Sequence, residues 1–166
     1  MVLDWASAFA KPVIDRDEKV LHKMKAYFTG YRKYGMSHER TVAIYDDEFW
    51  EVQDRLLNWR RRSHKYRLHW LLIDGEWKVE SGENTVALQI KTDQGIMKLV
   101  VRHPANMSCK TSVVRAGGLV YGERDVKPYE GWVSRNYGEK FPALSFAFEI
   151  ESAYHTTFTS EFSFSD

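Results

Sequence analysis

The chain holds very little cysteine, since Cys109 is the one cysteine among its 166 residues. A single thiol cannot form an internal disulfide, and it cannot supply the several thiolates of a cysteine zinc cluster. Cys109 stands in a strand-like run, and we interpret it as a small hydrophobic residue of the core. The fold must therefore be held together by packing and hydrogen bonds.

The sequence also lacks an excess of positive or negative residues. It has 24 Lys and Arg residues and 23 Asp and Glu residues, which give a formal net charge of +1. Such a balance argues against a general nucleic-acid-binding protein. No stretch is long and apolar enough to span a membrane. Residues 1–10 contain Asp4 and no positively charged region, so we recognise no signal peptide in this chain. We expect neither nucleic acid nor a membrane as a partner.

Recognisable catalytic motifs are absent as well. The sequence has no glycine-rich phosphate loop and no nucleophile elbow, and its six histidines lack the spacing of a metal-binding pair. The carboxylates form no identifiable acid/base pair for glycoside hydrolysis. The sequence therefore predicts no metal and no cofactor.

What the chain does contain is a strong strand signal. Hydrophobic residues make up 43% and aromatic residues 14% of the sequence, which suits a packed core and suits strands or sugar-stacking surfaces. Apolar and polar residues alternate through most of the chain, as at Tyr66, Leu68, Trp70 and Leu72. Turn signals recur about every ten residues. We predict one all-β domain over residues 1–166, an antiparallel β-sandwich of roughly ten or more strands.

Two shorter patterns give local predictions. Asp74-Gly75 stands between two alternating runs and predicts a β-hairpin. Trp5 and Phe9 are four residues apart, which predicts one helical turn over residues 4–10.

Tyr31, His38 and Arg40 lie close together in the sequence. Elimination at a uronate needs a cation that neutralises the carboxylate, a base that removes the neighbouring proton, and an acid that protonates the leaving oxygen. These three residues have the right types and are candidates for that chemistry. The alternative is that Gly30 and Gly35 shape a turn in which Tyr31 packs.

A second candidate region is the loop around Trp132, Arg135 and Tyr137, since aromatic faces stack on sugar rings and arginine matches carboxylate or sulfate. The alternative is a structural loop in which Trp132 closes the sandwich edge. The strongest basic cluster, residues 60–62, lies between two predicted strands and is either a contact for a polyanion or a solvated turn.

Four segments in this order resemble the C-terminal β-sandwich domain of the heparinase II/III-like polysaccharide lyases. Residues 28–40, 49–56, 66–70 and 130–138 read FTGYRKYGMSHER, FWEVQDRL, YRLHW and EGWVSRNYG. The resemblance extends from about Trp5 to about Phe148. It implies a helical catalytic toroid ahead of the β region, and β-elimination on uronate-containing polysaccharide such as a glycosaminoglycan. The family's His-x-Asp strand and Asp-Pro-Gly-Thr-Tyr phrase are not found here, so we transfer no catalytic assignment.

The leading hypothesis is therefore a β-sandwich domain of such a lyase, inactive by itself, that supports the toroid. It would bind acidic polysaccharide through Trp132, Arg135 and Tyr137 together with Tyr31, His38 and Arg40. The resemblance further implies a location in the periplasm or outside the cell. If absent parts of the lyase cover one side of the sandwich, a bare apolar face or sheet edge should remain. That face would meet the toroid or a second copy in a homodimer.

Two alternatives stay open. One is a stand-alone polysaccharide lyase in which Tyr31 and His38 act as acid and base while Arg40 neutralises the substrate carboxylate. The other is a structural interaction module without affinity for sugars.

Overall fold

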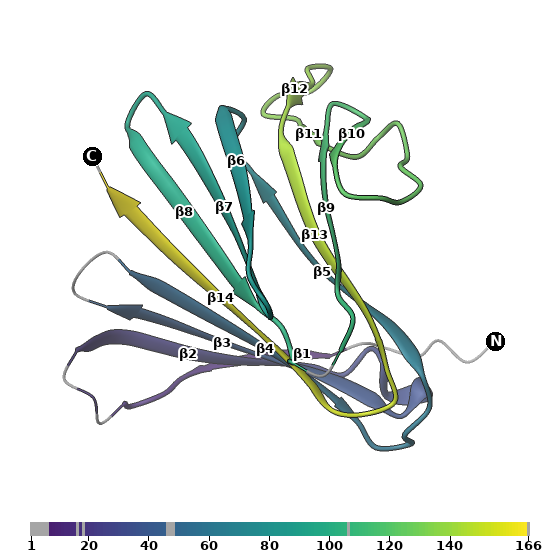
Figure 1. Ribbon diagram of the computed structural model, residues 1–166. Coiled ribbons are helices and arrows are strands. Elements are labelled where there is room, and N and C mark those ends of the chain that lie inside the picture. The colour runs from purple at the N-terminus through teal and green to yellow at the C-terminus, as the bar shows by residue number, and fades with distance from the viewer. Residues whose placement is uncertain (1–6, 16, 18, 46–48, 106, 166) are drawn as a thin grey trace.

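The computed structural model describes residues 7–15, 17, 19–45, 49–105 and 107–165. Two antiparallel sheets pack face to face (Figure 1). The larger sheet has eight strands in the order β1-β2-β3-β4-β14-β8-β7-β6, and the smaller has four in the order β10-β9-β13-β5. Among these described residues no helix is long and apolar enough to cross a membrane.

The strands of the large sheet are β1 (Ala8–Pro12), β2 (Val20–Phe28), β3 (Met36–Tyr45), β4 (Trp50–Asn58), β6 (Glu76–Ser81), β7 (Thr85–Thr92), β8 (Gly95–Arg102) and β14 (Thr156–Ser165). The small sheet contains β5 (His64–Leu72), β9 (Lys110–Arg115), β10 (Gly118–Tyr121) and β13 (Leu144–Ser152). A separate ribbon pairs β11 (Trp132–Val133) with β12 (Phe141–Pro142), and the 3-10 helix η1 (Arg32–Tyr34) connects β2 to β3. This architecture confirms the predicted all-β antiparallel sandwich.

The core lies between the inward faces of the two sheets, where alternate residues of each strand meet. Its fully buried side chains include Leu88, Ile90, Leu99, Val101, Val113, Leu144, Phe146, Phe148 and Phe158. Burying a side chain of this size stabilises the fold by about 1.5–3 kcal/mol. Cys109 packs against this cluster as a partly buried residue, in agreement with its predicted role.

The small sheet ends at β5, whose Trp70 contacts β14. The Trp70 Nε1–H donates to Ser160 Oγ at 3.1 Å, and the ring meets Phe162 edge-on with centroids 5.0 Å apart. Past this edge the large sheet continues through β3, β2 and β1 (Figure 1). The eight-stranded sheet is therefore wider than the layer that covers it.

On the inward side of this extension, a largely apolar surface that we call the shelf is defined by Ala10, Met24, Val42, Ile44 and Trp50. His22 and Arg40 lie on the same side. Met24 is 51% exposed and Trp50 is 44% exposed. The outward face of the same strands is charged, since Glu39 pairs with Lys25 at 2.8 Å and with Arg55 at 3.1 Å. The extension thus keeps the apolar-in, polar-out pattern of a sandwich without an opposing sheet.

The two local predictions are wrong. Asp74 and Gly75 do not close a hairpin, because β5 pairs with β13 and β6 pairs with β7, so this turn carries the chain from one sheet to the other. Asp74 is held there by Arg115, whose Nε and Nη2 donate to its two carboxylate oxygens at 2.7 Å. The helical turn fails because residues 8–10 belong to β1, where backbone pairing with β2 replaces local hydrogen bonds. Trp5 lies outside the described residues.

Replacement of Phe148 by Ala tests the core. Phe148 is fully buried and packs against Phe146 with ring centroids 4.5 Å apart, so the variant should lose about 3–5 kcal/mol of unfolding free energy in urea denaturation. The matched control is Tyr137→Ala, because Tyr137 is fully exposed and its loss should change that free energy by less than about 0.5 kcal/mol. Equal effects of the two substitutions would contradict this account of the core.

Candidate functional site

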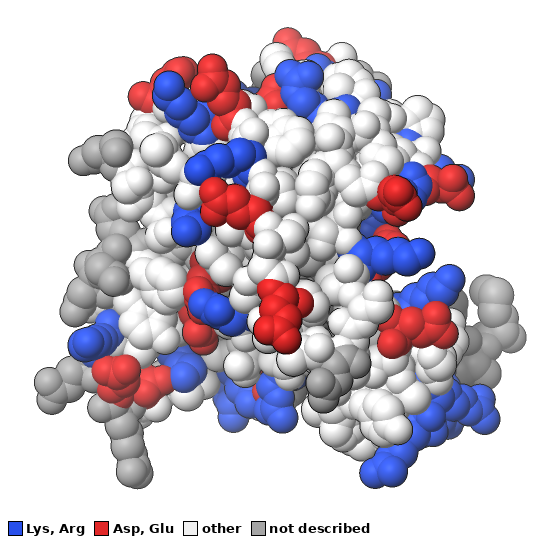
Figure 2. All heavy atoms as spheres, in the orientation of Figure 1, with Lys and Arg blue, Asp and Glu red and all other residues white. Residues whose placement is uncertain are grey.

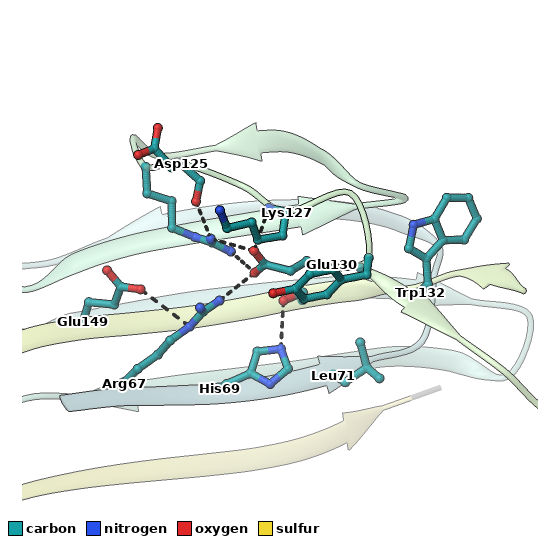
Figure 3. A pocket seen from close by; sticks show the side chains of 12 residues that line it. Arg67, His69, Leu71, Asp125, Lys127, Glu130, Trp132 and Glu149 are labelled. Atoms are coloured by element: carbon teal, nitrogen blue, oxygen red, sulfur yellow. Dashed lines mark hydrogen bonds and ion pairs between the residues drawn. The ribbon is translucent and has the colours of Figure 1, made fainter. Parts of the chain in front are cut away.

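A groove of about 740 Å³ lies on the outward face of the small sheet, and we call it the outer groove (Figure 3). Its floor is formed by Arg67 and His69 of β5 and by Ser145 of β13. Its wall is the segment of residues 124–132, which runs over the sheet between β10 and β11. The groove therefore combines side chains from three distant parts of the sequence.

Gly131 fixes the wall onto the sheet. Its carbonyl oxygen accepts the N–H groups of Ala116 at 2.8 Å and Ala143 at 2.9 Å. Its φ of 71° lies in the left-handed region, and a Cβ at this position would stand 2.7 Å from the Val114 carbonyl oxygen. Only glycine fits this close approach, so the glycine of the EGWVS phrase has a structural reason.

Glu130 is the electrostatic centre of the outer groove. Its carboxylate accepts hydrogen bonds from the Arg124 guanidinium, from Arg67 Nη2 at 2.8 Å and from the Lys127 N–H at 2.9 Å. These donors, with Arg124 first, outweigh desolvation and lower the pKa of Glu130 from 4.5 to about 2. Arg67 also reaches Glu149 at 3.6 Å, so both arginines of the groove are paired with carboxylates.

His69 and Ser145 share a hydrogen bond between Nε2 and Oγ at 2.8 Å on the groove floor (Figure 3). Desolvation, assisted by the positive charge of Arg67, lowers the pKa of His69 below its ordinary value. A neutral imidazole next to a hydroxyl can donate to or accept from a sugar hydroxyl. Sequence reasoning had no access to this pair, because its two residues are 76 positions apart.

The three predicted carbohydrate-binding residues occupy different surroundings on one loop. Trp132 lines the end of the outer groove, donates its Nε1–H to Pro128 O at 3.1 Å, and has Lys140 Nζ 4.6 Å from its ring centroid. Arg135 lies over the ring of Phe141 at 5.8 Å. Tyr137 projects fully into solvent. Only Trp132 of the three contributes to the groove.

Two of the three predicted catalytic candidates meet at a buried carboxylate. Asp54 is 3% exposed and accepts hydrogen bonds from His38 Nε2 at 2.6 Å and from Arg40 Nε at 2.7 Å. Burial alone would raise the pKa of Asp54, but the hydrogen bonds from His38 and Arg40 outweigh it and hold that pKa below its usual value. The Arg40 guanidinium also lies 5.1 Å from the Trp70 ring centroid. This cluster borders the shelf at the edge of the small sheet.

Tyr31, the third candidate, packs edge-on against Phe28, with the ring centroids 5.2 Å apart. Sequence reasoning did not find Asp54, Arg67, Arg124 or Glu130. Asp54 and Glu130 lie in phrases that carry the family resemblance, but the sequence predicts neither residue as part of a site. The spacing of these residues in the sequence does not indicate the ion pairs, because most of the partners are far apart in the chain.

The described residues hold no group of three His, Cys, Asp or Glu side chains that could bind a metal ion. The floor of the outer groove carries charged groups and a hydroxyl, and its end is aromatic. These groups are suited to hydrogen bonding with a polar ligand.

Comparison with known proteins agrees with the resemblance seen in the sequence. A family model described as "Heparinase II/III-like, C-terminal" matches residues 7–165. No curated protein matches the chain.

Solved structures with the same fold come from much longer chains. A heparinase III gene product has a TM-score of 0.67 and 14% identity, covering 94% of this chain and 21% of that chain. The heparan sulfate lyase HepC from Pedobacter heparinus has a TM-score of 0.63 and 16% identity, covering 93% and 21%. A further heparinase III has a TM-score of 0.63 and 15% identity, with the same coverage. The chain spans about a fifth of each structure it resembles.

Replacement of Glu130 by Gln tests the ion network. Ionised Glu130 stabilises the fold above its ordinary pKa of 4.5, and this contribution is lost as the pH falls toward the folded pKa of about 2. Glu130→Gln should therefore lose about 1–3 kcal/mol of unfolding free energy at neutral pH, and the gap to the wild type should narrow below pH 4.5.

Urea denaturation over a pH series measures this gap. The control is Glu139→Gln, since Glu139 is exposed and accepts one side-chain bond, from Asn136. A gap for Glu130→Gln that stays constant on acidification would contradict the assignment of the shifted carboxyl.

Proposed function

The chain belongs to the heparinase II/III-like C-terminal family, and we propose that it serves as the accessory β-sandwich of a polysaccharide lyase. In this role it supports the catalytic toroid of the lyase and binds acidic polysaccharide in the periplasm or outside the cell. The observation that carries the proposal is the family match along residues 7–165, together with a chain that spans about a fifth of the structures it resembles.

The shelf supports the first part of this role. Its apolar side chains continue the inward face of the sandwich past β5, and Met24 and Trp50 are half exposed there. Exposed apolar faces that border a core are typical of surfaces that pack against another domain. The cluster of His38, Arg40 and Asp54 adds a polar rim, as protein interfaces have. We assign the shelf to contact with the catalytic part.

The loop of Trp132, Arg135 and Tyr137 supports the second part. Tyr137 and Arg135 are exposed, and Trp132 stands where the outer groove opens. Aromatic rings and a guanidinium suit sugar rings and their carboxylate or sulfate groups. The solved structures with this fold include one named as a heparan sulfate lyase, which suggests sulfated uronate polymers as the ligand class.

Catalysis by this domain alone is not part of the proposal. His38 and Arg40 both hydrogen-bond to the buried Asp54, and we assign this cluster to the rim of the shelf. Tyr31 packs on Phe28, the cross-strand neighbour of His38.

Replacement of Met24 by Glu tests the shelf. Since Met24 is 51% exposed, the isolated domain should keep its unfolding free energy within about 0.5 kcal/mol. In the lyase that carries this domain, the buried carboxylate should lower the melting temperature of the whole protein. The control is Gln53→Glu, which adds the same charge on the outward face of β4. Identical melting of the two variant lyases would exclude the shelf as the contact.

Polysaccharide binding is tested with the purified domain on heparan sulfate, polygalacturonate and dextran at roughly 50 and 200 mM salt. We expect binding to the two acidic polymers that weakens at the higher salt, no binding to neutral dextran, and no release of unsaturated uronate product. Absence of binding to both acidic polymers would remove this part of the proposal, and product release would favour the stand-alone lyase.

A further inference from the structure

One end of the molecule gathers cationic side chains that come from three separate elements. We call it the basic end, and it consists of Lys11 of β1, Arg32 and Lys33 of η1, and Arg60, Arg61 and Arg62 of the loop between β4 and β5. Figure 2 shows Lys and Arg side chains collected at the lower right of the molecule, where Figure 1 has η1 and this loop. All six residues are exposed.

The six cations of the basic end have no carboxylate partner among the described residues. Elsewhere the ion pairs are Arg40–Asp54, Arg55–Glu39, Arg67–Glu130, Arg102–Glu161, Arg115–Asp74 and Arg124–Glu130. One carboxylate reaches the loop, since Glu151 accepts a hydrogen bond from Ser63 Oγ at 2.8 Å. A chain with a net charge of only +1 thus has a cluster of six unpaired cations, three of them consecutive in the sequence, at this end.

The backbone holds this end in a defined shape. The Trp59 N–H donates to Gly35 O at 3.0 Å, and Arg60 Nη1 donates to Lys33 O at 3.3 Å. Gly35 has a φ of 76°, and a Cβ there would stand 2.4 Å from Arg60 Cγ, so glycine permits the loop to lie against η1. The cations are therefore presented by a folded corner of the sandwich.

A groove of about 400 Å³ with aromatic walls opens beside these cations. Phe9, Tyr27 and Trp59 contribute its rings, and Lys11 and Arg32 contribute its charges. Phe9 is 66% exposed and Trp59 is 58% exposed, so their faces are available for stacking. Rings next to unpaired cations match a polymer whose sugar rings carry carboxylate or sulfate groups.

We propose that the basic end is a second site for acidic polysaccharide, in addition to the loop of Trp132, Arg135 and Tyr137. The anionic groups of the polymer lie on Arg32, Arg61 and Arg62, and a sugar ring lies on Trp59. The inference rests on the proposed function for the class of ligand, and it names a surface separate from the outer groove. In that groove the arginines are already neutralised by Glu130 and Glu149, so they offer little charge to a polyanion.

The experiment compares two variants that lose the same three charges. Arg32→Gln/Arg61→Gln/Arg62→Gln alters the basic end, and Lys91→Gln/Lys98→Gln/Lys110→Gln alters exposed or half-exposed cations on other strands. None of the six side chains forms an ion pair with another residue that the structure describes, so both variants should fold. Heparan sulfate is the probe, with its dissociation constant measured across a salt series and circular dichroism confirming the fold.

The basic-end variant should bind heparan sulfate at least about tenfold more weakly, and its salt dependence should fall by a slope of about two. The control variant should stay within about twofold of the wild type. Trp59→Ala should weaken binding about three- to tenfold with the slope unchanged. These results together support the site.

Equal losses in the two triple variants would overturn the site and leave polysaccharide binding intact. No binding by the wild type would overturn both the site and the proposed ligand class. A DNA duplex of matched charge serves as a second probe, and tighter binding to it than to heparan sulfate would overturn the assignment to a glycan.

Discussion

The structure depends on the packing of the four-stranded sheet against the eight-stranded sheet. The contact between the small sheet and β4, β14, β8 and β7 forms the core, and it ends where Trp70 meets Ser160 and Phe162. The strands past that line keep an apolar inward face because their sequence alternates as in any sandwich. The same difference in width thus yields a stable core and an uncovered shelf, which is the surface that we propose for contact with another domain.

Charge on the surface follows a similar division. Six arginines in the described part of the chain are paired with carboxylates, and such pairs fix the loop over the small sheet through Glu130 and border the shelf through Asp54. The basic end lacks this compensation and is held by backbone contacts to Gly35. The paired charges therefore hold loops and strands in place, whereas the unpaired cations of the basic end are available to a ligand.

The sequence was sufficient for the strands and the family, because period-two alternation and ordered phrases are local signals. It was not sufficient to predict which strands pair with each other or which charged residues meet. Asp74-Gly75 has the composition of a hairpin turn, yet the partner of β5 is β13, and only tertiary packing selects it. Glu130 meets Arg67 from 63 residues away. Asp54 was hidden within an alternating strand, where a buried carboxylate has the same pattern as a buried apolar residue.

The strand order has a consequence for how the protein is made. The last two long strands are interior ones, with β13 between β9 and β5 and β14 between β4 and β8. A nascent chain can form its early hairpins, but neither sheet is complete until β13 and β14 have left the ribosome. Contacts such as Asn58 with His155 span 97 residues, which slows folding and leaves β4 and β8 as open edges meanwhile. During synthesis the domain thus passes through a stage with unpaired strand edges, to which chaperones can bind.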